Sequence, residues 1–284
     1  MLDALSVSWL DAVLLGILEG LTEFLPVSST GHLILLAEVL GGHDEAQKTL
    51  DIVIQLGAVL AVIVYYRQRL GTLVVGVVQR RPAELRLAAA LALGFLPAAV
   101  AGLLLHKAIK ARLFGPMPVA AALVLGGVLM IGVELGRARA ARSSTAPAPK
   151  DPGLVGLEHV TPRRALTIGL AQCAALWPGA SRSMATIVGG QLSGLSTATA
   201  AEFSFLLAIP TLGAATVFDL YKNGRTLLEA PGGAAALGIG LVVSFVVALL
   251  VIAAFLRYLR VFGMIPFGVY RILLGAAVVL IAAR

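Results

Sequence analysis

Glu19 and Glu23 are four residues apart, so on a helix both carboxylates project from the same face. Side by side in a medium of low dielectric constant, the two charges repel each other unless a cation neutralises them. Mg²⁺ and Ca²⁺ suit this arrangement, because they bind a few carboxylates together with water and phosphate oxygens. We therefore predict that Glu19 and Glu23 hold a divalent cation, with Glu23 also available for acid–base chemistry.

Three hydroxyl side chains, those of Ser28, Ser29 and Thr30, follow a proline at a position where a new helix is expected to begin. Such a hydroxyl usually caps the helix, but it becomes a nucleophile when a base lies next to it. His32 and Glu23 are both close enough in sequence to act as that base. We predict that this cluster takes part in catalysis. The alternative for His32 is that it is a packing residue held by hydrogen bonds.

A second cluster carries hydrogen-bond donors in place of carboxylates. Ser181, Arg182 and Ser183 follow a Pro-Gly turn and are expected at a helix N-terminus, where free backbone N–H groups attract anions. The planar guanidinium of Arg182 matches the geometry of phosphate oxygens, and Thr186 adds a hydroxyl one turn later. Together the two clusters predict a phosphate or pyrophosphate site.

The composition places these clusters in a membrane protein. The chain has 284 residues, of which 59% are hydrophobic and 13% charged, whereas soluble domains carry roughly 25% charged residues. The excess apolar surface must face lipid, so we predict an all-α polytopic integral membrane protein. The net charge of +7 does not indicate nucleic-acid binding, because no basic run is interleaved with aromatic residues. The single cysteine excludes an intrachain disulfide.

Two kinds of apolar stretch are present. Residues 9–40 and 164–192 are each interrupted midway by a polar cluster that contains proline, which predicts two re-entrant helix–loop–helix hairpins. The other apolar stretches are long enough to cross a bilayer, near residues 50–66, 87–105, 117–136, 199–220, 233–256 and 265–283.

The order of one hairpin and three spans, repeated, predicts two inverted repeats. We expect a single membrane domain over residues 1–284, in which the first repeat covers about 1–136, a cytoplasmic linker about 137–163 and the second repeat about 164–284.

Most Lys and Arg residues fall in the predicted loops at 67–86, 137–164 and 257–264. Positive charge is concentrated in cytoplasmic loops, so we expect both termini to face outside. Five charged residues are expected inside the membrane, where such groups are costly and mostly functional; these are Glu19, Glu23, Arg182, Glu202 and Arg271. The alternative is that they form internal ion pairs that fix helix packing.

Two motifs carry a family resemblance. EGLTEFLPVSSTGH at residues 19–32 and LWPGASRSMAT at residues 176–186 closely resemble the signature motifs of undecaprenyl-diphosphatases, the bacitracin-resistance type of bacterial undecaprenyl pyrophosphate phosphatase. The likeness covers nearly the whole chain and extends through IQLGAVLAV at 54–62, EFSFLLAIP at 202–210 and IPFGVYR at 265–271. No motif position departs from the family pattern.

The resemblance implies an activity and a location. Such proteins hydrolyse undecaprenyl diphosphate to undecaprenyl phosphate and inorganic phosphate, which recycles the carrier lipid for peptidoglycan synthesis. It implies an all-helical fold with two inverted repeats, a requirement for a divalent cation, Mg²⁺ or Ca²⁺, and a reaction at the external face of the bacterial inner membrane. The implied partners are the polyprenyl diphosphate and the bilayer, not nucleic acid, and a homodimer is left open.

The resemblance also implies roles at matching positions. Glu19 and Glu23 match acidic residues implicated in metal binding and catalysis, Ser29 a proposed nucleophile, and His32 a nucleophilic or acid–base histidine. Arg182 matches an arginine that binds the diphosphate. The remaining expected contacts to the diphosphate are Ser28, Thr30, Ser181, Ser183, Thr186 and, as a second cation, Arg271.

Two other classes of protein remain open from the residues alone. Transporters and lipid flippases also use inverted repeats and broken helices that meet at the middle of the membrane. In that case the glutamates would carry protons or a coupling cation, and Arg182 would hold an anionic substrate. A purely structural membrane scaffold would leave the charged residues inside the membrane unexplained.

Overall fold

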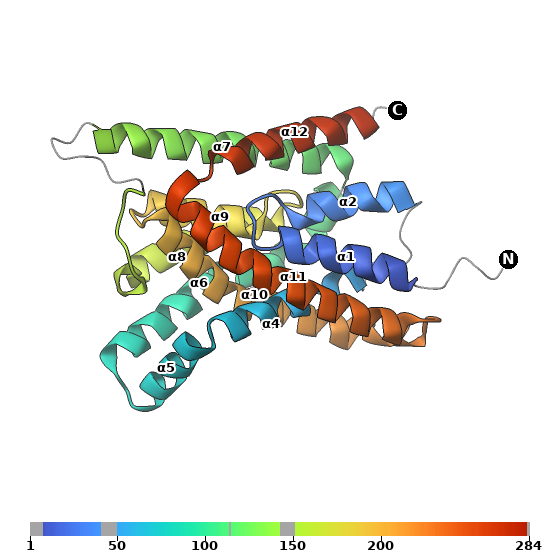
Figure 1. Ribbon diagram of the computed structural model, residues 1–284, viewed down its shortest axis with the longest axis horizontal. Coiled ribbons are helices and arrows are strands. Elements are labelled where there is room, and N and C mark those ends of the chain that lie inside the picture. The colour runs from blue at the N-terminus through green and yellow to red at the C-terminus, as the bar shows by residue number, and fades with distance from the viewer. Residues whose placement is uncertain (1–7, 41–49, 114, 143–150, 283–284) are drawn as a thin grey trace.

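The structure, a computed structural model, describes residues 8–40, 50–113, 115–142 and 151–282 (Figure 1). Within these ranges the chain forms helices and no β-strand, which confirms the predicted all-α class. The α-helices are α1 (Trp9–Thr22), α2 (Ser29–Leu40), α4 (Gln55–Tyr65), α5 (Arg67–Val78), α6 (Pro82–Arg112), α7 (Pro116–Arg142), α8 (Pro162–Gln172), α9 (Arg182–Leu192), α10 (Thr197–Glu229), α11 (Gly233–Phe262) and α12 (Ile265–Ala282). Two short 3₁₀ helices are η1 (Leu157–His159) and η2 (Cys173–Leu176).

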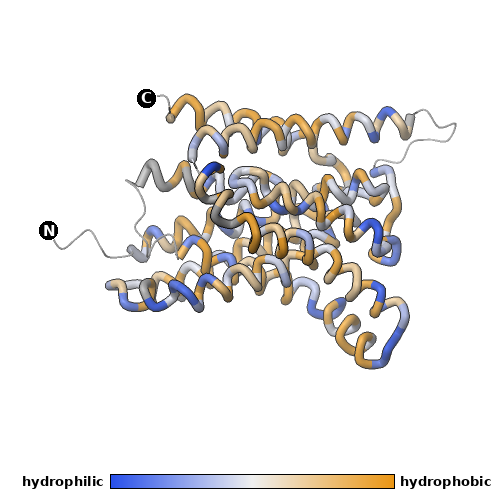
Figure 2. The backbone as a smooth tube through the Cα atoms, turned by 180° about the vertical axis from the view of Figure 1, so that it is seen from behind, coloured by the Kyte–Doolittle hydropathy of each residue, from blue (hydrophilic) through white to orange (hydrophobic). Residues whose placement is uncertain are grey.

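Among the described residues, α6, α7, α10, α11 and α12 contain segments that are long and apolar enough to cross a membrane. Only 22 to 39% of the most apolar window of each helix is buried inside the protein. Large apolar side chains therefore face outward, as Leu103 and Leu104 do on α6, and long apolar stretches follow the helices in Figure 2. These features confirm a multi-pass membrane protein.

The prediction of a loop over residues 67–86 is wrong. The span expected near residues 50–66 is helical over Leu50–Tyr65, but the chain then continues as α5, bent by 75° from it. The two helices together form a sixth candidate span or a re-entrant pair. Helix α5 packs against the start of α6, where Arg69 and Glu84 form a salt bridge of 2.7 Å.

Both predicted hairpins are broken where the sequence indicates. In the first, α1 and α2 are separated by residues 23–28; in the second, α8 and α9 are separated by η2 and a turn. Ser28 and Ser181 end these turns with positive φ angles of 75° and 69°, a conformation that is rare for residues other than glycine. Each serine caps the next helix, because its Oγ accepts the N–H of the residue three positions on.

Close helix contacts hold the first helix of each hairpin against a long span. A Cβ atom added at Gly16 of α1 would lie 2.9 Å from the Gly240 carbonyl oxygen of α11, and one added at Gly169 of α8 would lie 2.7 Å from that of Gly94 on α6. The two hairpins thus pack by the same device. The inverted repeats themselves, with the boundaries given above, stay a prediction.

The part of the core that lies beside the first turn is aromatic. Phe24 is fully buried and packs edge-to-face on Phe205 of α10, with ring centroids 5.1 Å apart. Helices α7 and α12 lie along each other at one side of the bundle (Figure 1). This packing places α12 next to both hairpin turns.

Candidate functional site

The two hairpin turns lie in direct contact. Ser183 at the start of α9 donates a hydrogen bond from Oγ to the Leu25 carbonyl oxygen in the first turn, at 2.9 Å. Arg271 of α12 donates to a carbonyl in each turn, that of Pro26 at 3.2 Å and that of Gly179 at 3.0 Å. The carboxylate cluster and the donor cluster of the sequence therefore share one location.

Glu23 lies at the centre of this location. One of its carboxylate oxygens accepts a hydrogen bond from Ser29 Oγ at 2.9 Å, and the other accepts one from an Arg182 guanidinium nitrogen, also at 2.9 Å. All three side chains are buried. A charge that is buried away from water is stable only when a well-placed partner of opposite charge compensates it. Arg182 is that partner for Glu23.

Arg182 has further partners on α10. Its second terminal nitrogen donates to the carbonyl oxygen of Ser204 at 3.1 Å and to Ser204 Oγ at 3.3 Å. The guanidinium also lies 5.5 Å from the centre of the Phe24 ring. Its Nε–H, however, is buried and has no hydrogen-bond partner. Such an unpaired donor is rare in proteins and points to an absent acceptor.

Glu19 is fully buried one turn before Glu23, and neither of its carboxylate oxygens accepts a hydrogen bond. Asp51 is a further acidic residue that acts electrostatically on Glu19. A carboxylate in this setting needs a proton or a cation. Among the described residues, no group of three or more His, Cys, Asp or Glu side chains is arranged to hold a metal. Two carboxylates with water and phosphate oxygens still fit Mg²⁺.

His32 is bonded away from Ser29. Its Nδ1 lies 2.7 Å from the Ser28 carbonyl oxygen, and its Nε2 lies 2.6 Å from the hydroxyl of Tyr270 on α12. Of the two bases that the sequence left open for Ser29, the structure places Glu23 in hydrogen-bond contact.

The other predicted site residues surround this centre. Ser28 caps α2, and Thr30 lies half-buried in the first turn of α2. Ser181 Oγ contacts Ser183 Oγ at 2.9 Å, and Thr186 Oγ1 lies 2.6 Å from Ser204 Oγ. Their contacts to a diphosphate stay predictions.

Arg271 is fully buried, and all the hydrogen bonds that the structure describes for it go to backbone carbonyls. Besides the two hairpin turns, it donates to Ala122 at 3.0 Å and Leu123 at 3.3 Å on α7. In this arrangement its guanidinium joins the turns to α7. Its predicted role as a second cation for the diphosphate is not tested by these contacts.

Sequence reasoning missed two residues of this site. Ser204 holds Arg182, and Tyr270 contacts His32. Both lie in the motifs EFSFLLAIP and IPFGVYR, so the family likeness of those segments was the available signal. Gln172, which follows Gly169 by three positions as Glu19 follows Gly16, is also buried, and neither atom of its amide group has a hydrogen-bond partner.

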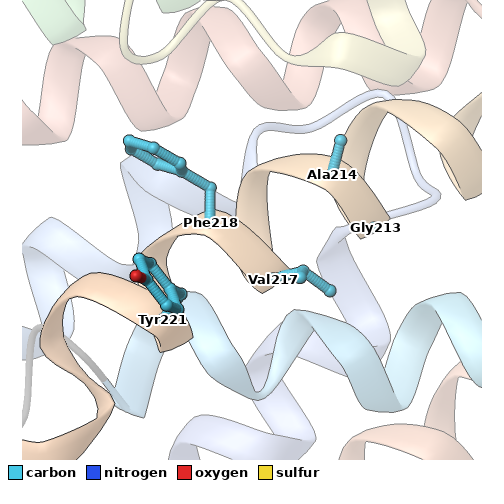
Figure 3. Close-up of a pocket in the computed structure, with 5 residues that line it drawn as sticks. All are labelled: Gly213, Ala214, Val217, Phe218 and Tyr221. Atoms are coloured by element: carbon cyan, nitrogen blue, oxygen red, sulfur yellow. The ribbon is translucent and has the colours of Figure 1, made fainter.

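A shallow apolar pocket lies elsewhere, along one helix. Figure 3 shows its lining side chains on α10: Gly213, Ala214, Val217, Phe218 and Tyr221. Four of these residues have no polar side-chain atom, and Tyr221 is 90% exposed. The pocket has the character of a lipid-facing surface, and the Tyr221 hydroxyl is the one polar side-chain group among these lining residues.

Comparisons with known proteins identify the family of this chain. The family model described as bacitracin resistance protein BacA matches residues 12–277. A protein of Sorangium cellulosum named undecaprenyl-diphosphatase is 72% identical over 270 residues, which cover 95% of this chain and 85% of the relative. A second protein of that name, from Aromatoleum aromaticum, is 48% identical over 267 residues, covering 94% of this chain and 92% of the relative. The chain therefore belongs to the bacitracin resistance protein BacA family.

Proposed function

We propose that this protein is a membrane hydrolase that converts undecaprenyl diphosphate to undecaprenyl phosphate and inorganic phosphate, and so recycles the carrier lipid for peptidoglycan synthesis. The names of its relatives support this substrate. The observation that carries the proposal is the buried chain of contacts from Ser29 through Glu23 to Arg182. It combines a hydroxyl, a base and a cation, which are the groups that phosphoryl transfer requires.

Glu23 is the base in this proposal, because its carboxylate accepts a hydrogen bond from the Ser29 hydroxyl. Ser29 Oγ, or a water molecule in its place, attacks the terminal phosphorus as Glu23 takes the proton. The bond from that phosphorus to the bridging oxygen breaks, and undecaprenyl phosphate leaves. If Ser29 is the nucleophile, water then hydrolyses the phosphoserine and releases inorganic phosphate.

Arg182 binds and orients the diphosphate. Its unpaired Nε–H is a ready donor for a phosphate oxygen, and Ser204 keeps the guanidinium in place through two contacts. The N-terminus of α9, where Ser183 stands, adds positive potential on the same side. Together these groups stabilise the negative charge that develops as the phosphoanhydride bond breaks.

The residues present fit a divalent cation, because Glu19 is a buried carboxylate without a partner beside Glu23. We propose that Glu19 and Glu23 hold Mg²⁺ or Ca²⁺. When bound, this ion supplies a positive charge that neutralises the diphosphate oxygens. Glu19 would contribute the second negatively charged ligand to this ion, beside Glu23.

Phosphate release in detergent micelles tests the function, since micelles hold no gradient that a transporter could use. We expect the purified wild-type protein to release inorganic phosphate from undecaprenyl diphosphate. Glu23→Gln should lower kcat by about 100-fold or more, which is the usual contribution of a general base. Thr72→Val removes a hydroxyl on α5 that bonds only within its own helix and should leave the rate unchanged.

No phosphate release from a folded wild-type preparation would contradict the proposal and favour a transporter. Ser29→Ala separates the two nucleophiles, because the rate should fall by orders of magnitude if the serine attacks and much less if water does.

We further propose that the protein lies in the bacterial inner membrane with both termini outside and the reaction at the external face. The support is the concentration of Lys and Arg in residues 67–86, which form α5 and the start of α6, and in residues 137–164 and 257–264. Single cysteines at Ser29 and Ser181 should then be labelled from outside, and labelling only from the cytoplasm would contradict this.

A further inference from the structure

His32 and Tyr270 form a pair at the edge of the candidate site. The Tyr270 hydroxyl lies 2.6 Å from His32 Nε2, and the two ring planes are 7° apart with centroids at 5.6 Å. The residues come from α2 and α12 and are 238 positions apart in the chain. Neither the composition nor the spacing of the sequence places them together.

The other nitrogen of His32 settles which atom carries the proton. Nδ1 lies 2.7 Å from the Ser28 carbonyl oxygen, and a carbonyl oxygen only accepts hydrogen bonds. Nδ1 must therefore carry a hydrogen. In the neutral ring Nε2 then has the lone pair, so the Tyr270 hydroxyl donates to it. If the ring gains a proton, Nε2 becomes the donor and the Tyr270 oxygen accepts.

The pair lies outside the buried chain of contacts around Glu23. Tyr270 is 44% exposed, whereas Glu23 and Arg182 are 7% and 9% exposed. Ser29 and His32 are three residues apart on α2, so they are neighbours on its surface. Adjacent Arg271, bonded to both hairpin turns, fixes the position of α12 and hence of Tyr270.

We propose that Tyr270 is a positioning residue that holds His32 in the Nδ1–H form and connects its Nε2 to the outer side of the site. This inference rests on the function proposed above. Two residues then handle protons: Glu23 takes the proton from the nucleophile, and His32 takes up and releases a proton at Nε2 through the Tyr270 hydroxyl. When a proton from water binds the Tyr270 oxygen, the hydroxyl proton moves to Nε2, so His32 gains one positive charge and Tyr270 stays neutral. The reverse transfer returns His32 to its neutral form.

Tyr270→Phe tests the proposal, because it removes the hydroxyl and keeps the ring. We expect kcat for phosphate release to fall by about 10- to 150-fold, as for the loss of one hydrogen bond to a group that becomes charged. KM should change little, since Arg182 and Glu23 stay intact. Tyr221→Phe is the matched control, because this tyrosine is 90% exposed on α10, and its rate should equal that of the wild type.

A spectroscopic measurement makes the test independent of turnover. In ¹⁵N spectra of the protein in micelles, the His32 ring signals are assigned by their loss in His32→Asn. In Tyr270→Phe the Nε2 signal should shift, while the Nδ1 signal stays that of a protonated nitrogen. Unchanged His32 signals, or an unchanged kcat, would overturn the proposal. If the wild type releases no phosphate while the Nε2 signal still shifts, the pair is confirmed and the proposed reaction is what fails.

Discussion

The carboxylate of Glu23 is shared between a hydroxyl and a guanidinium, and this sharing explains how two charges persist in an apolar protein. Removing one partner of a buried pair leaves the other charge uncompensated. The Arg182 contact to Glu23 is therefore expected to matter for stability as well as for catalysis.

Arg182→Met should lower the free energy of unfolding by about 3 to 5 kcal/mol, because it leaves the buried Glu23 carboxylate without its cationic partner. The double variant Glu23→Gln with Arg182→Met should recover part of this loss. Unfolding in mixed micelles, titrated with a denaturing detergent, measures both. Arg225→Met breaks the exposed pair with Glu229 and should change little. Equal losses in the two arginine variants would contradict the assignment.

Glu19 makes a prediction that does not depend on activity. If Mg²⁺ binds at Glu19 and Glu23, adding it at about 100 times its Kd should stabilise the wild type by about 2.7 kcal/mol. Glu19→Gln should remove this gain, measured as the shift of the unfolding midpoint. Glu84→Gln, at the salt bridge between α5 and α6, should keep it. Equal stabilisation of Glu19→Gln and wild type would exclude Glu19 as a ligand.

The sequence predicted the residues of the candidate site better than their pairing. Both clusters could be predicted from the sequence, one from the i, i+4 spacing of Glu19 and Glu23 and the other from the donors around Arg182. The sequence did not show that Ser29 pairs with Glu23 or that His32 pairs with Tyr270. The positive φ angle of Ser28 decides how the chain turns there, and spacing rules for regular helices do not describe such a turn.

At the scale of helices, each hairpin is held by a glycine contact. Gly169 allows α8 to approach α6 so closely that an added Cβ would lie 2.7 Å from one carbonyl oxygen and 3.0 Å from another. Backbone atoms cannot rotate away as a side chain can, so the helices themselves would have to separate.

Gly169→Ala should therefore destabilise the protein and reduce phosphate release, because it moves the hairpin that carries Arg182. Gly132→Ala on α7 is the matched control. A Cβ added at Gly132 meets nothing within 4 Å, so alanine there should stabilise the helix by roughly 0.5 to 1 kcal/mol. Thermal unfolding and phosphate release check both variants. A Gly169→Ala protein as stable and as active as wild type would refute the contact.

Helix α5 shows why one element escaped prediction. Its arginines, Arg67 and Arg69, are typical of a loop next to a membrane span. In the structure Arg69 instead pairs with Glu84 across the turn to α6. A contact between residues on two elements overrides the local pattern, whereas the breaks at Pro26 and Pro178 are local and were predicted.

At the scale of the whole molecule, the chain presents apolar faces on its long helices and charges at their ends (Figure 2). The distribution of Lys and Arg predicts that the turn between α5 and α6 is cytoplasmic and that the turn between α10 and α11 is external.

Labelling of single cysteines checks this orientation. The only native cysteine is Cys173, so Cys173→Ser supplies the background. Gln79→Cys, after α5, should be labelled from the cytoplasm, and Glu229→Cys, at the end of α10, from outside. Labelling of both residues from one side would show that the orientation or the number of crossings is wrong.

The contacts of α12 also bear on the order in which the protein becomes functional during synthesis. Arg271 bonds to Pro26, which precedes it by 245 residues, and Tyr270 bonds to His32, 238 residues earlier. A ribosome that has released the first hairpin into the membrane must still translate almost the entire chain before these bonds can form. The nascent protein therefore cannot have a complete site until its last helix is inserted, and a chain truncated before α12 should reach the membrane without becoming an enzyme.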